Sequence, residues 1–224
     1  MAKSAQSKPD AVMVVPTVDL FESGREFCGF GYTDCTNRDY PQIILENTKF
    51  MRRDAVEHNP DFQQIVAWGI LVNPGLRQAV VYQRAENYPD SRLAGQWSFG
   101  IGGHVLERDL DKGDTFRNAI SRDIREGRVT LSTDAGKRVK NALYSCVDHL
   151  GYISIPWQVN NFHFGLVYLV HTNATVVAPN KDDFARVEMM NLRELIELGA
   201  NRKEKIDMWS SAIWPLMMSL LFHD

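Results

Sequence analysis

The strongest chemical signal in this sequence is a group of charged residues on one predicted helix. Residues 102–130 read GGHVLERDLDKGDTFRNAISRDIREGRVT. Arg122, Asp123 and Glu126 lie three and four positions apart, so one helix face presents them together. Mg²⁺ prefers carboxylate and carbonyl oxygens and often bridges to substrate phosphates. The spacing therefore predicts a divalent-metal site beside a phosphate chain.

The helix that carries these groups is predicted over Thr115 to about Arg128. Asp114 is its expected N-cap. An apolar face at helical spacing would bury the other side of the helix, and it consists of Phe116, Ala119, Ile120 and Ile124. Gly102 and Gly103 end the preceding strand, where the absence of side chains lets backbone carbonyls approach a metal closely.

This stretch resembles the Nudix hydrolase signature, G-x5-E-x7-R-E-U-x-E-E-x-G-U, where U is a bulky aliphatic residue. Gly103 takes the first glycine. Asp114 takes the first Glu, and seven residues separate it from Arg122. The positions that follow are matched by Asp123, Ile124 and Glu126. The box in this chain would span residues 102–130.

The resemblance extends to one bacterial subgroup that carries GIGGH in place of PGG. That subgroup tends to have a tyrosine and an arginine on the preceding strand and an E-x-R-L segment. Here these look like Tyr82, Arg84 and the looser run from Glu86 to Arg92-Leu93.

Four departures from the signature stand out. Ten residues instead of five separate Gly103 from Asp114, so this loop carries an insertion. Asp114 and Asp123 replace Glu, and Val129 replaces the last glycine. Gly127 replaces the second Glu of the pair, which in the family is usually a principal metal ligand. We interpret Gly127 as a lost ligand, with a helix-ending glycine as the alternative.

The resemblance implies a Mg²⁺- or Mn²⁺-dependent hydrolase that cleaves the pyrophosphate bond of a nucleoside diphosphate linked to another moiety. It implies a metal held by the Gly102 carbonyl, Asp123 and Glu126. Arg122 would orient the acids, and Asp114 would support the loop and the helix start. The alternative is a Nudix-fold protein that binds a nucleotide-like ligand in a regulatory role without cleaving it. A Nudix-like isomerase is disfavoured because no cysteine lies near the box.

Substrate contacts are predicted outside the helix. Gly103 and His104 could meet a phosphate, although a strand histidine is more often structural. Arg84 and Arg92 could grip a phosphate, since guanidinium forks suit it, or each could form a structural ion pair. His163, in an aromatic-rich strand, is expected to be packed.

The general base is unassigned, and Glu107 and Glu188 are its candidates. Within the insertion, Glu107, Asp109 and Asp111 could replace the acid missing at position 127. Acids in surface loops are more often simply solvated, so both interpretations stay open.

Composition limits the partners. The 224 residues carry a formal net charge of −3, which disfavours nucleic acid as a partner and leaves a small phosphorylated metabolite. No apolar run approaches the length of a membrane span. Three scattered cysteines, Cys28, Cys35 and Cys146, predict reduced thiols in the cytoplasm. Residues 1–10 contain no signal peptide and are expected to form a flexible tail.

Periodicity predicts the fold. Expected strands cover Ala11–Pro16, Ile65–Val72, Gln78–Arg84, Ala142–His149, Phe162–His171 and Ala185–Met190. Asn191 should cap a helix with Glu194, and a last helix should run from about Lys203 to Leu221 with a kink at Pro215. This order indicates one domain over residues 11–224 of α/β (α+β) class. It would be a Nudix-type mixed sheet sandwiched between helices, with an N-terminal extension and a C-terminal helix suited to a homodimer contact.

Overall fold

A computed structural model describes residues 11–22, 28–35, 37–111, 113–126, 129–133, 147–155, 162–179, 183–201 and 203–222. The predicted tail, Gly127 and the first residues of the expected Ala142–His149 strand lie outside these ranges. The strands are β1 (Ala11–Pro16), β2 (Gly29–Tyr32), β3 (Lys49–Arg52), β4 (Phe62–Asn73), β5 (Gln78–Arg84), β6 (Trp97–Ser98), β7 (Ile101–His104), β8 (Val129–Ser132), β9 (Val147–Ser154), β10 (His163–His171), β11 (Val176–Pro179) and β12 (Phe184–Asn191). The helices are α1 (Thr17–Leu20), α2 (Tyr40–Asn47), α3 (Arg53–Val56), α4 (Thr115–Arg125), α5 (Leu192–Ala200), α6 (Met208–Ala212) and α7 (Trp214–Phe222), with 3₁₀ turns η1 (Thr33–Cys35) and η2 (Glu107–Leu110).

A ten-stranded mixed sheet forms the centre of the molecule. Its main path runs β12-β5-β4-β10-β9-β2, with β1 and β3 continuing from β4 and with β6 and β7 paired to β5 and β4. β4 and β10 are parallel from Gln64↔His163 to Val72↔His171, whereas the other pairs in the sheet are antiparallel. β4 is buried over nearly its whole length, as expected for a strand covered on both faces.

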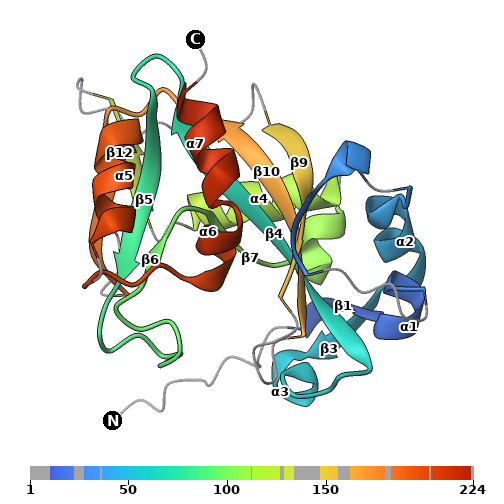
Figure 1. Ribbon diagram of the computed structural model, residues 1–224. Helices are drawn as coiled ribbons and strands as arrows, with labels where there is room; N and C mark the ends of the chain where they lie inside the picture. Colours follow the sequence, from blue (N-terminus) through green and yellow to red (C-terminus); the bar gives the residue numbers. More distant parts are fainter. Residues whose placement is uncertain are drawn as a thin grey trace.

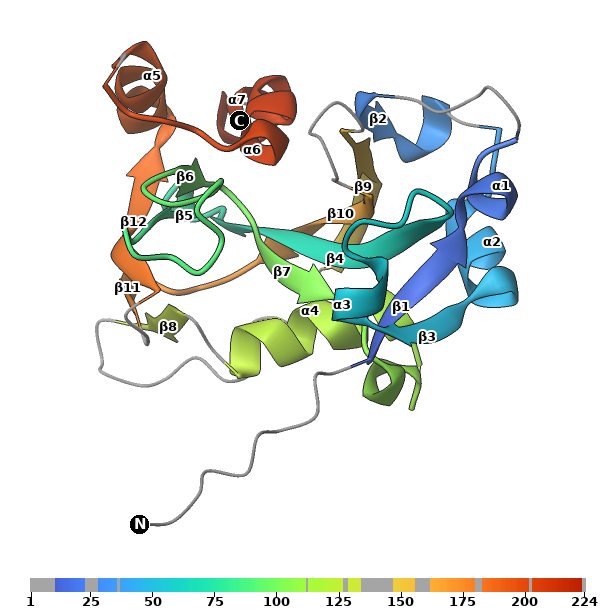
Figure 2. The same ribbon diagram turned by 90° about the horizontal axis from the view of Figure 1, so that it is seen from below.

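Helices cover both faces of this sheet (Figures 1 and 2). On one face, the apolar side of α4 packs with residues of α1 and α2 into a single cluster. On the other face, α5, α6 and α7 contribute to a second cluster. Figure 2 shows α4 below the sheet and the three C-terminal helices above it. The predicted sandwich of a mixed sheet between helices is confirmed.

The sheet forks where the functional site forms. β4 and β5 pair only at Val72↔Ala79 and Asn73↔Gln78. Beyond this point β5 pairs with β6 and β4 pairs with β7, so the strands diverge. The indole of Trp68 lies inside the fork against Gly100, where any Cβ would overlap it. Glycine is therefore required at position 100 by close packing.

The C-terminal helix prediction was wrong in form. Instead of one helix kinked at Pro215, there are two short helices, and residues 203–207 precede them without helical structure. Asp207 caps α6 by accepting a hydrogen bond from the Ser210 backbone N–H at 2.8 Å. Pro215 is the second residue of α7, where its missing N–H costs no helical hydrogen bond. The proline therefore starts a helix and does not bend one.

Local signals elsewhere were accurate. The Asp114 side chain accepts hydrogen bonds from the Phe116 and Arg117 backbone N–H groups. The capping box of Asn191 and Glu194 is formed at α5. In the part of the chain that is described, no helix is both long and apolar enough to span a bilayer.

Candidate active site

Arg122 is the centre of the signature-like stretch on α4. Its Nε and Nη2 donate to the two carboxylate oxygens of Asp109, each at 2.9 Å. Nη2 also donates to the His104 carbonyl at 2.8 Å, and Nη1 donates to Asp123 Oδ1 at 2.7 Å. All three guanidinium nitrogens are thus used. Arg122 holds the helix, strand β7 and the inserted loop together.

The inserted loop is ordered by Asp109. This residue is 3% exposed and forms a buried, bidentate ion pair with Arg122, and its Oδ2 also accepts the Leu106 N–H at 2.8 Å. The interpretation of Asp109 as a solvated loop acid was therefore wrong. Asp109 is also poorly suited to replace the missing metal ligand, because it is buried and both of its oxygens already accept hydrogen bonds. Glu107 and Asp111, on either side, are exposed.

Asp123 and Glu126 are the two acids of the box that lie on α4 and at its C-terminal end. Asp123 Oδ2 lies 2.5 Å from where a Cβ on Gly103 would be, so only glycine leaves room for this carboxylate against β7. Glu126, one turn further on, is the C-cap of α4 and forms an exposed ion pair with Arg108 at 3.1 Å. Such a pair is worth little and is easily exchanged for another partner.

Two carboxylates are a donor set that Mg²⁺ commonly uses when a substrate supplies the remaining ligands. Among the described residues, no group of three or more His, Cys, Asp or Glu side chains is arranged to hold a metal. Mg²⁺ does not need such a cage, because it commonly binds through one or two carboxylates together with substrate phosphates and water. The donor set of Asp123 and Glu126 is therefore compatible with Mg²⁺ or Mn²⁺ bound together with a phosphate chain.

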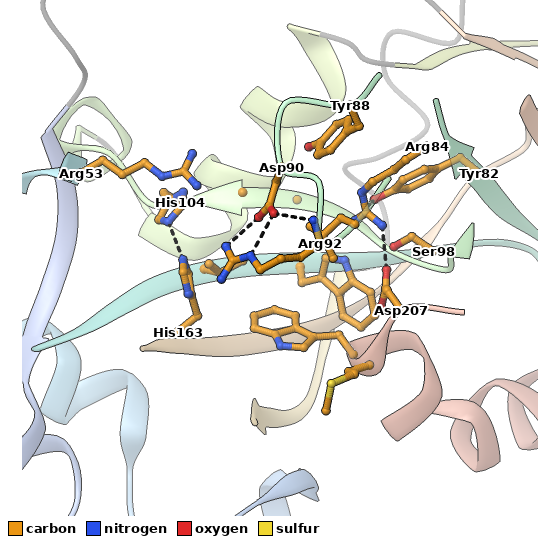
Figure 3. Close-up of a pocket in the computed structure, with 17 residues that line it drawn as sticks. Arg53, Tyr82, Arg84, Tyr88, Asp90, Arg92, Ser98, His104, His163 and Asp207 are labelled. Carbon is orange, nitrogen blue, oxygen red and sulfur yellow. Dashed lines mark hydrogen bonds and ion pairs between the residues drawn. The ribbon is translucent and has the colours of Figure 1, made fainter. Parts of the chain in front are cut away.

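A pocket of about 210 Å³ opens beside the box, in the fork of the sheet (Figure 3). Gly102, Gly103 and His104 line one side of it, so the strand that contacts Asp123 also forms a pocket wall. The remaining walls come from α3, β4, β5, the loop after β5, β6, β10 and the start of α6. They comprise Arg53, Val66, Trp68, Tyr82, Arg84, Tyr88, Asp90, Arg92, Leu93, Ser98, His163, Asp207, Met208 and Trp209.

The inner end of this pocket is built around Arg84. Its Nη1 donates to Asp207 Oδ2 at 3.0 Å and its Nη2 to the Tyr82 hydroxyl at 3.3 Å. The guanidinium carbon lies 5.3 Å and 5.5 Å from the ring centroids of Tyr82 and Tyr88. Burial alone would lower the pKa of Arg84, but the oxygens of Tyr82 and Asp207 outweigh it and raise the pKa. Arg84 therefore stays charged.

The open end of the pocket carries two half-exposed arginines, Arg53 and Arg92. Arg92 pairs with Asp90 at 2.7 Å and lies 3.6 Å from Glu57, which also pairs with Arg53. Hydrogen bonding to Arg92 holds the pKa of Asp90 below its usual range. Because these pairs are largely in water, an incoming anion can replace the acids at little cost.

His104 and His163 form a contact on the wall between β7 and β10. Their Nε2 atoms are 3.1 Å apart, so one ring donates and the other accepts. Burial lowers the pKa of His163 to about 4, which makes this ring neutral at pH 7. The expectation that His163 is packed is consistent with its burial, and its position on the pocket wall was not foreseen.

No protein-family model matches this sequence, and no curated protein matches it. Solved structures do. Tm1382, provisionally assigned as a Nudix hydrolase, superposes with a TM-score of 0.69 at 21% identity, covering 94% of this chain and 100% of Tm1382. The Nudix hydrolase from Alicyclobacillus acidocaldarius gives a TM-score of 0.54 at 10% identity over 70% of this chain and 91% of its own. This chain has the Nudix fold.

The Nudix fold separates the predicted site residues into two groups. Asp123 and the β7 residues Gly102, Gly103 and His104 lie where α4 meets β7, and Glu126 follows at the C-terminal end of α4. Arg84 and Arg92 line the same pocket from its other walls, but each is engaged in an ion pair, as the alternative interpretation allowed.

Two predicted residues lie away from this centre. Asp114 is nine residues before Asp123, which places it about 13 Å away along the helix, and it acts as the helix cap. Glu188 alternates with Val187 and Met189, which pack on the α4 side of the sheet. Its exposed side chain therefore lies on the opposite face. Glu188 is therefore poorly placed to act as a general base beside the acids of α4.

Most of the pocket was missed by sequence reasoning. Trp68, Tyr88, Ser98 and Asp207 come from separate segments that no local pattern links. One signal was present, because Asp207 stands directly before a short apolar helix, as an N-cap does. Backbone hydrogen bonds dock this segment on β6, with Trp97 N–H donating to the Lys205 carbonyl at 2.7 Å and Asp207 N–H to the Trp97 carbonyl at 2.9 Å.

Proposed function

We propose that this protein is a Nudix-type hydrolase that cleaves the pyrophosphate bond of a nucleoside diphosphate linked to another moiety, with Mg²⁺ or Mn²⁺ as cofactor. One observation carries the proposal. The Asp123 carboxylate lies directly against Gly103, and Gly103 in turn lines the pocket. Gly103 thus stands between Asp123 and the pocket, and a phosphate chain that extends from the pocket past Gly103 would meet the Asp123 carboxylate.

The chain's own residues would divide the work. Asp123 and Glu126, with the Gly102 carbonyl as a further predicted ligand, would hold the metal. The bound metal would polarise the phosphoryl oxygens and lower the pKa of an attacking water. Arg122 fixes the Asp123 carboxylate by a charge-assisted hydrogen bond, so it acts as a positioning residue. Arg53, Arg92 and His104 at the open end would contact the phosphates.

The proposal is tested by incubating the protein with Mg²⁺ or Mn²⁺ and a panel of nucleotide sugars, dinucleoside polyphosphates, NADH, ADP-ribose and nucleoside triphosphates. We expect metal-dependent hydrolysis of a member of the panel that is abolished by chelation and by Glu126→Gln or Asp123→Asn. Glu197→Gln is the matched control, because Glu197 forms a similar exposed ion pair with Arg193 on α5. Equal activity of the wild type and both α4 variants would refute the site.

A second candidate is a Nudix-fold protein that binds such a ligand in a regulatory role without cleaving it. The observation that favours it is the lack of a third metal-binding side chain among the described residues near Asp123 and Glu126. Saturable binding of a panel member without turnover would support this candidate. Gly127→Glu provides a further test, because restoring the signature acid should raise metal affinity or activity if Gly127 replaced a ligand.

A further inference from the structure

Two buried polar atoms at the inner end of the pocket have no hydrogen-bond partner among the described residues. They are Arg84 Nε and Ser98 Oγ, and neither bonds to any described residue. Arg84 is 9% exposed and Ser98 is 1% exposed. Both residues line the pocket, and Ser98 lies opposite Tyr82 in the β5–β6 pair. An unsatisfied buried polar atom is costly, so a pair of them in one pocket indicates a place that a ligand completes.

The inner end is unsuited to a phosphate. The Arg84 charge is already balanced by Asp207, and the side chains of both residues are about nine-tenths buried. A phosphate placed there would face the buried Asp207 carboxylate, and the cost of that repulsion is high where water is excluded. The open end differs, since the ion pairs of Arg53 and Arg92 are solvent-exposed and readily exchanged.

The walls of the inner end favour a flat ring. Trp68 and Trp209 contact each other edge to face, with ring centroids 5.7 Å apart, and both line the pocket. Tyr82 and Tyr88 flank Arg84 on the same pocket (Figure 3). Stacking of a nucleobase on such aromatic groups is typically worth about 1–3 kcal/mol.

We propose that the inner end is a specificity subsite for the uncharged nucleobase of the substrate, read by Ser98 and Arg84 Nε. The hydroxyl of Ser98 can donate or accept, and Arg84 Nε–H donates, so together they match a base edge with an acceptor beside another polar atom. The phosphates then extend past His104 and Gly103 toward Asp123. This inference rests on the proposed function and gives the substrate a direction in the pocket.

Binding without metal tests the subsite separately from hydrolysis. The probes are the four common ribonucleosides, which are uncharged, and inorganic pyrophosphate, each titrated calorimetrically. We expect at least one nucleoside to bind and Ser98→Ala to weaken it about 3- to 10-fold, the effect of one lost hydrogen bond. Pyrophosphate binding should be unchanged by Ser98→Ala and weakened by Arg92→Met. Ser154→Ala is the matched control, because Ser154 is a buried serine that does not line the pocket.

Several outcomes overturn the subsite. It is wrong if no nucleoside binds, if Ser98→Ala leaves every nucleoside affinity unchanged, or if Arg84→Met abolishes pyrophosphate binding while Arg92→Met does not. Arg84→Met leaves the buried Asp207 carboxylate without its ion-pair partner and could unfold the chain. The result for Ser98→Ala therefore decides the test. Nucleoside binding without turnover would support the subsite and contradict the proposed hydrolase activity. Turnover whose KM is unchanged by Ser98→Ala would support the hydrolase and contradict the subsite.

Discussion

Two buried arginine–aspartate pairs, Arg122–Asp109 and Arg84–Asp207, stand on either side of this site and differ in completeness. All three guanidinium nitrogens of Arg122 donate to protein oxygens. Arg84 uses two nitrogens, and its Nε has no partner among the described residues. The first pair is a closed structural junction. The second pair retains hydrogen-bonding capacity beside a pocket, as the proposed subsite requires.

The largest effect should follow from opening the closed pair. Asp109→Ala leaves the Arg122 charge buried without its main partner, so the free energy of unfolding should fall by about 3–5 kcal/mol. Chemical denaturation measures this directly. Asp111→Ala, in the same segment but exposed, should change it by no more than about 0.5 kcal/mol. A loss below about 1 kcal/mol for Asp109→Ala would show that the junction is not what orders the insertion.

The pH dependence of the free energy of unfolding tests the burial of His163 on the pocket wall. The pKa of His163 is about 4 in the folded protein, below the ordinary value of about 6.5. The unfolded chain therefore binds more protons between these values, and stability falls as pH falls through that window. Between pH 7 and pH 4 the wild type should lose about 3 kcal/mol more than His163→Gln. His58→Gln, at an exposed histidine, should retain the wild-type pH dependence, and a shared profile for all three proteins would contradict the prediction.

Substitutions at Gly100 and Gly103 compare the packing of Trp68 in the fork with the positioning of the Asp123 carboxylate. Gly100→Ala forces a methyl group into the Trp68 indole and should cost about 1–3 kcal/mol of unfolding free energy. Gly103→Ala meets only the end of the flexible Asp123 side chain, so it should cost less stability while displacing that carboxylate and lowering hydrolysis. Thermal denaturation and activity assays on the two variants measure the contrast. Equal stability losses would mean that Asp123 is as rigidly packed as Trp68.

The smallest effect on stability is expected for Ser98, which lines the pocket with the Arg84–Asp207 pair. Ser98→Ala removes a buried hydroxyl that has no partner in the described part of the chain, so the free energy of unfolding should stay within about 1 kcal/mol of the wild-type value or rise. Denaturant titration of the ligand-free protein measures it. A loss above about 2 kcal/mol would reveal a structural hydrogen bond at Ser98 and remove it from the pocket.

Sequence reasoning succeeded where information is local. The Asp114 cap, the apolar face of α4 and the contact between Arg122 and Asp123 all follow from spacing within one helix. It failed for Asp109, because burial of an acid thirteen residues before its partner depends on how the insertion folds back. Arg84 and Asp207 are separated by 123 positions, and only the three-dimensional fold brings them together. Pro215 was misjudged because its effect depends on whether a helix begins before it or at it.

The docking of residues 205–209 on Trp97 has a consequence for the order in which the protein gains its abilities. Asp207 and Trp209 are pocket walls, yet they come from near the end of the described chain. Both partners of the Asp109–Arg122 junction precede these residues in the chain, so they are synthesised first. We therefore expect any ligand binding in this pocket to arise late in synthesis, after the residues that pack around α4, and to require docking of the C-terminal helices.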